Sequence, residues 1–281
     1  MEGTLLGIDI GGTNINIGRI KNGTIEQETF RAVDKKHSQE KILSLLFEAI
    51  DALNDSSVIA IGIGVPGTVD QLTGIIYDIQ NIPVWKEIAL KKILENKYSL
   101  PVSINNDANC FALGEKIFGK GKNYKNFIAL SIGTGIGAGI IIDNKLYNGH
   151  LCGAGEIGML PYKEGIIEDY AGSFFFSNKH NTTVKEFSEK ATAGDENALQ
   201  LFNDFGVHVG AAVKAVLYLF SPDAIIIGGS ISKAYPLFQK SVEHALQSFA
   251  YQKQIQNLKI EISNQSGVAL LGAASLCLQN P

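Results

Sequence analysis

The chain has 281 residues, of which 45% are hydrophobic and 19% charged, a balance typical of a soluble globular protein and not of a disordered one. No apolar run approaches the roughly 18 residues that suggest a membrane-spanning helix. Its 24 basic and 28 acidic residues give a formal charge of −4. Only two of the basic residues are arginines, which argues against a nucleic-acid partner.

The three cysteines, Cys110, Cys152 and Cys277, lie far apart in the sequence and form no pair spaced to hold zinc or a redox disulfide. No basic segment followed by a long apolar stretch comes after Met1, so we expect no secretory signal. Together these features predict a cytoplasmic protein.

The first part of the chain alternates strands and helices, a pattern typical of an α/β protein. Apolar residues at helical spacing after Ser38, a suitable N-cap, predict the first helix. The predicted elements are strands over 4–20 and 25–33, a helix over 38–54, a strand over 58–65, a helix over 84–98, a strand over 100–104 and a helix over 107–118.

The second part of the chain repeats the opening pattern. An apolar strand enters a Gly/Thr turn at 8–13 and again at 130–135, which predicts two similar lobes. We predict an N-terminal lobe of residues 1–118, with about 267–281 packing back on it, and a C-terminal lobe of residues 119–266. The further predicted elements are helices near 183–193 and over 196–220, 234–249 and 267–278, and strands at 224–227 and 258–262.

The first glycine turn combines backbone donors with a carboxylate. Gly11 and Gly12 leave their N–H groups unshielded, and Thr13 and Asn14 add polar donors. Asp9, at the end of the preceding strand, can hold a metal ion through water. An ordinary hairpin turn would show the same residues, but a phosphate group with Mg²⁺ also fits them.

The second glycine turn has no carboxylate. It contains Gly133, Thr134 and Gly135, and Ser131 stands at the position that corresponds to Asp9. Because one turn offers donors with a metal ligand and the other only donors, the two turns together suit a nucleoside triphosphate.

A polar run follows the strand over 100–104 and begins the next helix. Asn105, Asn106, Asp107 and Asn109 place four amide or carboxylate side chains in five residues, more than a helix cap requires. The helix dipole should keep Asp107 ionised. Asp107 could then accept a proton from a hydroxyl group while the asparagines bind the oxygens of a polyol.

Two further carboxylates, Glu156 and Glu168, lie near glycines and are candidates for a binding site. A pair of carboxylates also leaves open the acid and base of a glycoside hydrolase. Gly228-Gly229 follow a buried strand, where they let an adenine approach or only begin the next helix. His208, between two valines of a predicted helix, is expected to be a packed core residue.

Two other glycine motifs are incomplete. Residues 62–67 have the letters G-x-G-x-x-G, but a turn-like stretch follows where a dinucleotide site needs a helix. Residues 114–121 nearly spell a P-loop, but they lack its Ser/Thr and end a helix instead of following a strand. We expect neither motif to bind a nucleotide.

The order of the motifs resembles the ROK family of sugar kinases and repressors, in the actin/hexokinase-like superfamily. The resemblance runs nearly from end to end of the chain. Each segment alone is a weak signal, but the set in this order is specific. The segments are Asp9–Thr13, Gly64–Gly67, Asn106–Asn109, Gly133–Gly137, Gly155–Gly158, Glu168–Ala171 and Ile227–Gly229.

The resemblance implies two lobes with ribonuclease-H-like cores closing over a hexose, ATP held by both glycine turns and Gly228-Gly229, and a homodimer. It implies that Asp107 is the general base, while Asp9 anchors Mg²⁺ through water. Family repressors carry a DNA-binding domain before the first glycine turn, and this sequence has no room for one, which favours the kinase branch. The implied sugar-binding residues are Gly67, Asn106, Asp107, Glu156 and Glu168.

One departure from the family pattern concerns zinc. The family usually has a histidine after Glu-Ile-Gly, followed by a cysteine-rich zinc loop. Here Met159 stands at the histidine position, and residues 160–167, which separate it from Glu168, contain no cysteine. Because thioether sulfur is a poor ligand for zinc and a weak hydrogen-bond acceptor, we predict no structural zinc and one polar contact fewer to the sugar.

These features predict an ATP- and Mg²⁺-dependent hexose kinase, foremost a glucokinase acting on the sugar 6-hydroxyl. Several alternatives stay open: kinase action on N-acetylmannosamine, N-acetylglucosamine or fructose, polyphosphate as the donor, and a catalytically silent sugar-binding sensor.

Overall fold

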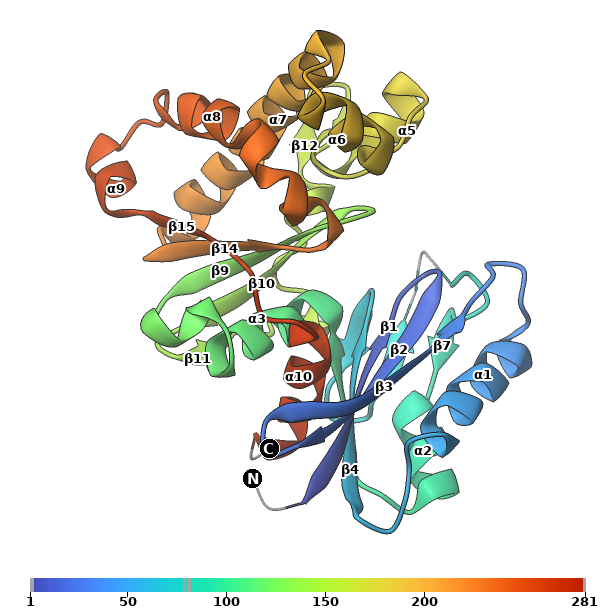
Figure 1. Cartoon of the computed structure of the whole chain (residues 1–281). Coiled ribbons are helices and arrows are strands. Elements are labelled where there is room, and N and C mark those ends of the chain that lie inside the picture. The colour runs from blue at the N-terminus through green and yellow to red at the C-terminus, as the bar shows by residue number, and fades with distance from the viewer. Residues whose placement is uncertain (1–2, 78, 80–81, 280–281) are drawn as a thin grey trace. The chain divides into compact units, whose positions relative to one another are not determined.

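The computed structural model describes residues 3–77, 79 and 82–279 (Figure 1). These residues form two compact units. The first unit holds those of Met1–Asn123, Gly139–Ala154 and Asn264–Pro281, and the second holds those of Tyr124–Ala138 and Gly155–Ser263. The predicted lobe boundaries near residues 118 and 266 stay a prediction; the structure adds that residues 139–154 pack with the first unit.

The first unit is built on a five-stranded sheet in the order β3-β2-β1-β4-β8. Strands β1, β2 and β3 form an antiparallel meander, whereas β4 runs parallel to β1, and β8 runs parallel to β4. The strands are β1 (Thr4–Ile10), β2 (Asn14–Lys21), β3 (Thr24–Ala32), β4 (Val58–Val65) and β8 (Val102–Asn106).

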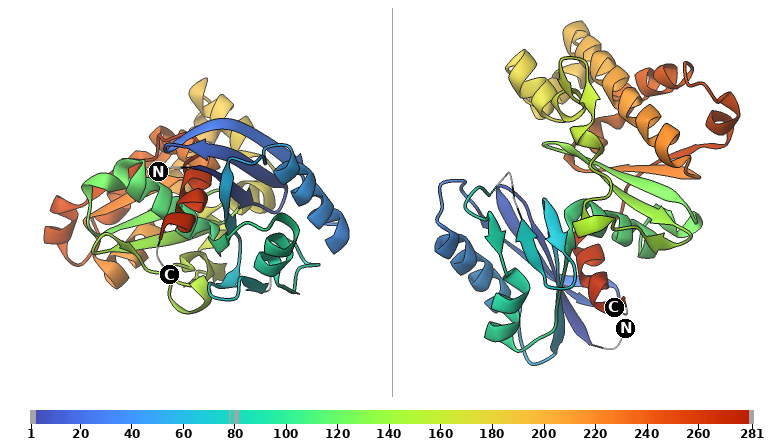
Figure 2. Two further views of the ribbon diagram at one scale, coloured as in Figure 1. Left: turned by 90° about the horizontal axis from the view of Figure 1, so that it is seen from below. Right: turned by 180° about the vertical axis from the view of Figure 1, so that it is seen from behind.

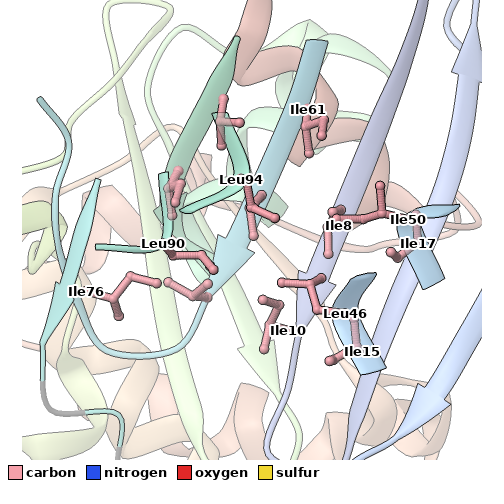
Figure 3. Close-up of a cluster of buried hydrophobic side chains, with 14 of the residues drawn as sticks. Ile8, Ile10, Ile15, Ile17, Leu46, Ile50, Ile61, Ile76, Leu90 and Leu94 are labelled. Atoms are coloured by element: carbon pink, nitrogen blue, oxygen red, sulfur yellow. The ribbon is translucent and has the colours of Figure 1, made fainter. Parts of the chain in front are cut away.

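One face of this sheet is covered by α1 (Gln39–Asp51) and α2 (Leu90–Tyr98). Figure 3 shows Ile8 of β1, Leu46 of α1 and Leu94 of α2 in the resulting apolar cluster. The chain's single tryptophan, Trp85, is fully buried in the same cluster. Ser38 caps α1 as predicted, because its Oγ accepts a hydrogen bond from the Lys41 N–H at 3.3 Å.

The other face of the sheet is covered by α3 (Asp107–Ile117) and the C-terminal α10 (Val268–Ser275). Figures 1 and 2 show α10 against the strands of the first unit. Its approach to the sheet is so close that a Cβ at Gly62 would overlap the carbonyl oxygen of Ala273. A glycine in the middle of β4 is therefore required by packing.

A three-stranded sheet in the first unit departs from the sequence prediction. Its strands are β5 (Thr68–Asp70), β6 (Ile75–Tyr77) and β7 (Glu87–Ile88), in that order. The helix predicted over 84–98 is wrong in its first part, because Glu87 and Ile88 pair with β6, and α2 begins only at Leu90.

A second five-stranded sheet, which lies mostly in the second unit, has the order β11-β10-β9-β14-β15. Strands β9 and β14 are parallel, as are β14 and β15. This order matches that of the first sheet position by position, which confirms the internal repeat. The strands are β9 (Phe127–Ile132), β10 (Ile136–Ile142), β11 (Lys145–Leu146), β14 (Ala224–Gly228) and β15 (Lys259–Ile262); β11 and the last residues of β10 pack with the first unit.

The helices of the second unit include α7, which is long and packs along α8 (Figures 1 and 2). A small hairpin, β12 (Pro161–Tyr162) and β13 (Gly165–Ile166), precedes α4. The helices are α4 (Glu168–Ala171), α5 (Phe174–His180), α6 (Val184–Thr192), α7 (Glu196–Phe220), α8 (Tyr235–Leu246) and α9 (Gln252–Asn257). Within the described residues, no helix is long and apolar enough to cross a membrane.

Candidate functional site

The carboxyl ends of β1, β4 and β8 bring the polar residues of the first unit together. Asp9 on β1 lies opposite Gly64 on β4, and Gly64 lies opposite Asn105 on β8. Helix α3 starts directly after β8, with Asp107 as its first residue. The charge of Asp107 contributes to raising the pKa of Asp9, as expected for two neighbouring carboxyl groups. The two predicted carboxylates of this unit therefore share one site.

Asp107 lies in the first turn of α3 and is partly accessible to solvent. Its Oδ1 accepts a hydrogen bond from the Ala108 N–H at 2.8 Å. Burial raises the pKa of Asp107, although its hydrogen bonds to backbone N–H groups act in the opposite direction. Desolvation therefore outweighs the effect of the N-terminal donors on this pKa. That Asp107 is ionised stays a prediction. A raised pKa suits a proton acceptor near neutral pH.

Asn106 serves as the N-cap of α3. Its Oδ1 accepts from the N–H groups of Ala108 at 2.9 Å and Asn109 at 3.3 Å. Its Nδ2 donates to the carbonyl oxygen of Gly67 at 3.2 Å. Two predicted sugar ligands, Asn106 and Gly67, are thus brought into contact, and one amide hydrogen of Asn106 is left for a ligand among the described contacts.

Asp9 is the candidate magnesium ligand. Burial raises its pKa to about 6, with a further increase from the charge of Asp107, while a hydrogen bond from the Asn16 side chain lowers it. Magnesium commonly binds through one or two carboxylates, several waters and the phosphates of a substrate. A single carboxylate beside a second one fits this mode. Within the described residues no three His, Cys, Asp or Glu side chains form a cluster, and a site of this kind needs none.

The turn between β1 and β2 presents unused donors. The Gly11 N–H donates to the Asn14 carbonyl oxygen at 2.8 Å. The N–H of Val33, the residue after β3, donates to the Thr13 carbonyl oxygen at 2.7 Å. In the described part of the chain, the N–H groups of Gly12 and Thr13 donate to no other group. Two adjacent free N–H groups at a turn form an anion-binding concavity.

A chain of amide side chains behind Asp107 was missed by sequence reasoning. Asn148 accepts from Asn105 at 2.9 Å and donates to Gln71 at 3.1 Å. Asn109 donates to Asn105 at 2.9 Å and to the carbonyl oxygen of Cys152 at 3.4 Å. These contacts hold the side chains of Asn105 and Asn109 in place. Asn148 carries no motif of its own and lies 43 residues from Asn105, so only the excess of polar residues at 105–109 pointed to such a network.

In the second unit, the predicted phosphate and adenine segments lie at one end of the sheet. Gly228 pairs with Ser131 on β9, the residue before the strand's last. The second glycine turn follows β9, and its Gly133 and Thr134 carbonyl oxygens accept from the Ser173 N–H at 2.9 and 3.1 Å. The structure thus brings Gly133, Thr134 and Gly135 close to Gly228 and Gly229.

Glu168 also belongs to this end of the second unit. Its Oε2 accepts from the Ile136 N–H at 3.3 Å, and a Cβ at Gly135 would overlap its carboxyl group. Burial raises the pKa of Glu168. Glu156 is exposed at the start of a short 3-10 turn, Ile157–Met159, and the Met159 side chain is 47% exposed.

The β12–β13 hairpin stands where the family pattern would have its zinc loop. Tyr162 of β12 is hydrogen bonded to Nδ1 of His208 on α7 at 3.1 Å, and its ring packs edge-on against Tyr170 of α4. Tyr170 in turn donates to Glu164 in the hairpin turn at 2.8 Å. His208 is buried, at 6% exposure, which confirms the prediction of a packed core histidine.

Comparison with known proteins places these observations in context. A model of the ROK family matches residues 5–280. The chain is 28% identical to the glucokinase of Thermotoga maritima, over 97% of this chain and 96% of that protein. It is 32% identical to the xylose repressor of Bacillus subtilis, over 89% of this chain and 70% of the repressor. Among solved structures, it resembles a ROK family glucokinase from Streptomyces griseus in complex with glucose and AMPPNP, with a TM-score of 0.86, 28% identity and coverage of 98% of this chain and 99% of that chain.

Proposed function

We propose that this chain, which belongs to the ROK family, is an ATP-dependent hexose kinase, foremost a glucokinase that phosphorylates the sugar 6-hydroxyl. The observation that carries the proposal is the pairing of Asp107 with Asp9 beside a turn that presents free N–H groups. This arrangement combines a proton acceptor with binding groups for a phosphate, which are the parts that phosphoryl transfer to an alcohol requires. The glucokinase relatives support the same reading.

In the proposed reaction, Asp107 accepts the proton of the sugar hydroxyl as that oxygen attacks the terminal phosphorus of ATP. The bond from this phosphorus to its bridging oxygen breaks, and ADP leaves with the electron pair. Its raised pKa brings its affinity for a proton closer to what this transfer needs. The N–H groups of Gly12 and Thr13 donate to the phosphate oxygens. Asp9 would hold magnesium, and a bound Mg²⁺ would neutralise charge on those oxygens.

The sugar is proposed to bind through the remaining amide hydrogen of Asn106 and the backbone at Gly67 in the first unit. Glu156 and Glu168 of the second unit are proposed to accept hydrogen bonds from sugar hydroxyls. The nucleotide is proposed to contact Gly133–Gly135 and Gly228-Gly229, because these glycines lie at one end of the second sheet and leave their backbone unshielded.

A second candidate function is a sugar-binding sensor without catalysis. It is favoured by the similarity to a xylose repressor and by Met159, which replaces a polar residue of the family's sugar site. N-acetylmannosamine, N-acetylglucosamine and fructose remain alternative substrates, and polyphosphate remains an alternative donor. Asp9 and Asp107 favour the kinase, because sugar binding alone requires neither a metal ligand nor a base.

A sugar panel tests the proposal. The protein is incubated with ATP, Mg²⁺ and each of glucose, N-acetylmannosamine, N-acetylglucosamine, fructose and xylose, and ADP formation is followed by a coupled assay. We expect the highest kcat/KM with glucose. Binding of a sugar by calorimetry without turnover on any of them would instead establish the sensor.

The variant Asp107→Asn tests the role of the base. The amide retains an oxygen that can accept from the Ala108 N–H but cannot take a proton, so kcat should fall by about 10²–10⁴ while the sugar Kd changes little. Asp143→Asn is a matched control, since Asp143 is exposed in the turn between β10 and β11. Equal kcat values in the two variants would exclude Asp107 as the base.

A further inference from the structure

A pocket of about 420 Å³ lies in the first unit beside the glycine turn. Its walls come from two places: the turn between β1 and β2, and the loop that leads from β3 to α1. Its volume falls within the range of small-molecule sites in proteins. The lining residues are Gly12, Thr13, Ala32, Val33, Asp34, Lys35 and His37.

Several hydrogen-bond donors line the pocket, although most of its wall is apolar. Gly12 and Thr13 line it and have free N–H groups within the described residues. The Thr13 hydroxyl oxygen accepts from Asn14 at 3.2 Å, so its own hydrogen can point to a ligand. Lys35, exposed on the loop, adds a positive charge.

The geometry of the loop leaves Nε2 of His37 as the ring nitrogen that can donate to a ligand. The Asp34 N–H donates to Nδ1 of His37 at 3.3 Å, and the His37 N–H donates to the Asp34 carbonyl oxygen at 2.9 Å. A ring nitrogen that accepts a hydrogen bond leaves the other ring nitrogen to donate one. His37 therefore offers a further N–H donor.

One group opposes an anion in this pocket. Asp34 also lines it, and one oxygen of its side chain accepts from the Lys36 N–H at 2.8 Å, which stabilises the loop. The negative charge of Asp34 and the positive charge of Lys35 offset each other, so the balance is decided by the N–H and hydroxyl donors. Donor-rich turns of this kind bind phosphate oxygens.

We propose that this pocket is a phosphate-binding subsite in which Lys35 and His37 hold a phosphate group next to the glycine turn. Its role in turnover rests on the proposed kinase function. The phosphate could belong to the chain of the phosphoryl donor or to the phosphorylated sugar, and the two sources share the same chemistry. The subsite supplies the side-chain cation that the glycine turn itself lacks.

Binding of tripolyphosphate to the full chain, measured by calorimetry, tests the subsite without any turnover. We expect Lys35→Ala to raise the Kd about threefold to tenfold, as loss of an exposed charge contact should. Lys36→Ala is the matched control: the residue is the next along the loop, carries the same charge and does not line the pocket, so its Kd should stay within about twofold of wild type.

Two more variants test the other groups. His37→Leu removes the donor and should raise the Kd by a similar factor. Asp34→Asn removes the opposing charge but keeps an oxygen for the Lys36 N–H, so it should lower the Kd about threefold. If wild type does not bind tripolyphosphate, or if the Lys35 and Lys36 variants behave alike, the subsite is excluded. Because Lys35 is exposed, its variant is expected to fold even where His37→Leu does not.

Kinetic measurements on the same variants separate the sources of the phosphate and the two proposals. A raised KM for ATP or polyphosphate in Lys35→Ala identifies the donor chain, whereas weaker inhibition by glucose 6-phosphate identifies the product. If wild type phosphorylates no sugar but Lys35→Ala still weakens tripolyphosphate binding, the kinase proposal fails and the subsite stands. If wild type turns over and the Lys35 and Lys36 variants match in every measurement, the subsite fails and the kinase stands.

Discussion

Asp9 and Asp107 show how burial changes the chemistry of an ordinary residue. Both carboxyl groups lie at the carboxyl ends of parallel strands, and the pKa of each is raised mainly by loss of water around it. A proton on either group lowers the energetic cost of holding two carboxylates together. Binding a cation at Asp9 has the same effect, so proton and magnesium compete for this residue in the proposed kinase.

The stability of the protein without ligands should therefore depend on the protonation of Asp9. Since its pKa rises from 3.8 to about 6 on folding, the folded chain holds this proton more tightly than the unfolded chain. The contribution of Asp9 to the free energy of unfolding is then expected to fall as the pH rises through this range, by about 3 kcal/mol in total, and to stay level above it. Asp9→Asn should remove this loss.

Urea denaturation across this pH range measures the effect. We expect Asp9→Asn to be more stable than wild type above about pH 6, with the difference shrinking toward about pH 4. A difference that does not change with pH would show that Asp9 titrates normally in the folded protein.

At the residue level, the sequence indicates which residues belong to the candidate site better than it indicates their burial and their hydrogen-bond partners. The polar run at 105–109 predicted a site, and the structure brings Asn106 into contact with Gly67. The direction of the Asp107 pKa could not be predicted, because it depends on how much water the fold removes. Asn148 could not be predicted either, since its partners lie far away in the sequence.

At the level of elements, the β12–β13 hairpin is fastened to its neighbours by side chains. Tyr162 reaches His208 on α7, Tyr170 of α4 reaches Glu164, and the Ile166 N–H donates to Asp169 at 3.0 Å. These contacts fix the start of α4, where Glu168 is the first residue. Aromatic packing and hydrogen bonds thus hold this hairpin against α4 and α7.

Removing one hydroxyl from the hairpin tests this idea. Tyr162→Phe loses the hydrogen bond to His208 and should lower the free energy of unfolding by about 1 kcal/mol. If Glu168 binds the sugar, the KM of this variant for the sugar should also rise about threefold while kcat changes little. The reason is that weaker sugar binding affects the ground state and the transition state alike. Tyr251→Phe, at an exposed tyrosine of the same unit, is the control. Equal KM values in both variants would show that the hairpin does not position Glu168.

The elements that sequence reasoning missed are short. The helix over 196–220 was predicted closely, because its apolar residues repeat at helical spacing over several turns. The helix over 107–118 was also predicted closely, with the polar run at 105–109 marking its start. Strand β7 has only two residues and is defined by its pairing with β6, which leaves almost no pattern in the sequence. The predicted helix therefore began at residue 84, whereas α2 begins at Leu90.

At the level of the whole molecule, the predicted fold class is confirmed: the protein has the two-lobed, actin/hexokinase-like fold of its family. The repeated Gly/Thr turn was enough to find the two related sheets, because each sheet starts with the same strand, turn and strand. The predicted homodimer and cytoplasmic location stay predictions.

The C-terminal segment after Ser263 packs with the first unit, so we expect its removal to have a strong effect on that unit. Helix α10 and the turn after it bury Leu270, Leu271 and Leu276, which contribute roughly 6 kcal/mol together. That is comparable to the whole stability of a typical domain. A chain that ends after Ser263 should therefore lose the fold of the first unit.

Limited proteolysis measures this loss. We expect rapid cleavage within residues 3–123 and survival of a fragment from 155–263, whereas a control chain ending after Gln279 should resist cleavage throughout. Equal resistance of the two chains would show that α10 adds little to the first unit.

The position of Trp85 gives the protein an intrinsic fluorescent reporter. As the chain's only indole, and fully buried among the apolar side chains of the first unit, it emits from that unit alone. Helical circular dichroism, in contrast, draws heavily on the 25 residues of α7 in the second unit. Recording both signals on one heated sample distinguishes one cooperative melting event from two, without a label or an engineered probe.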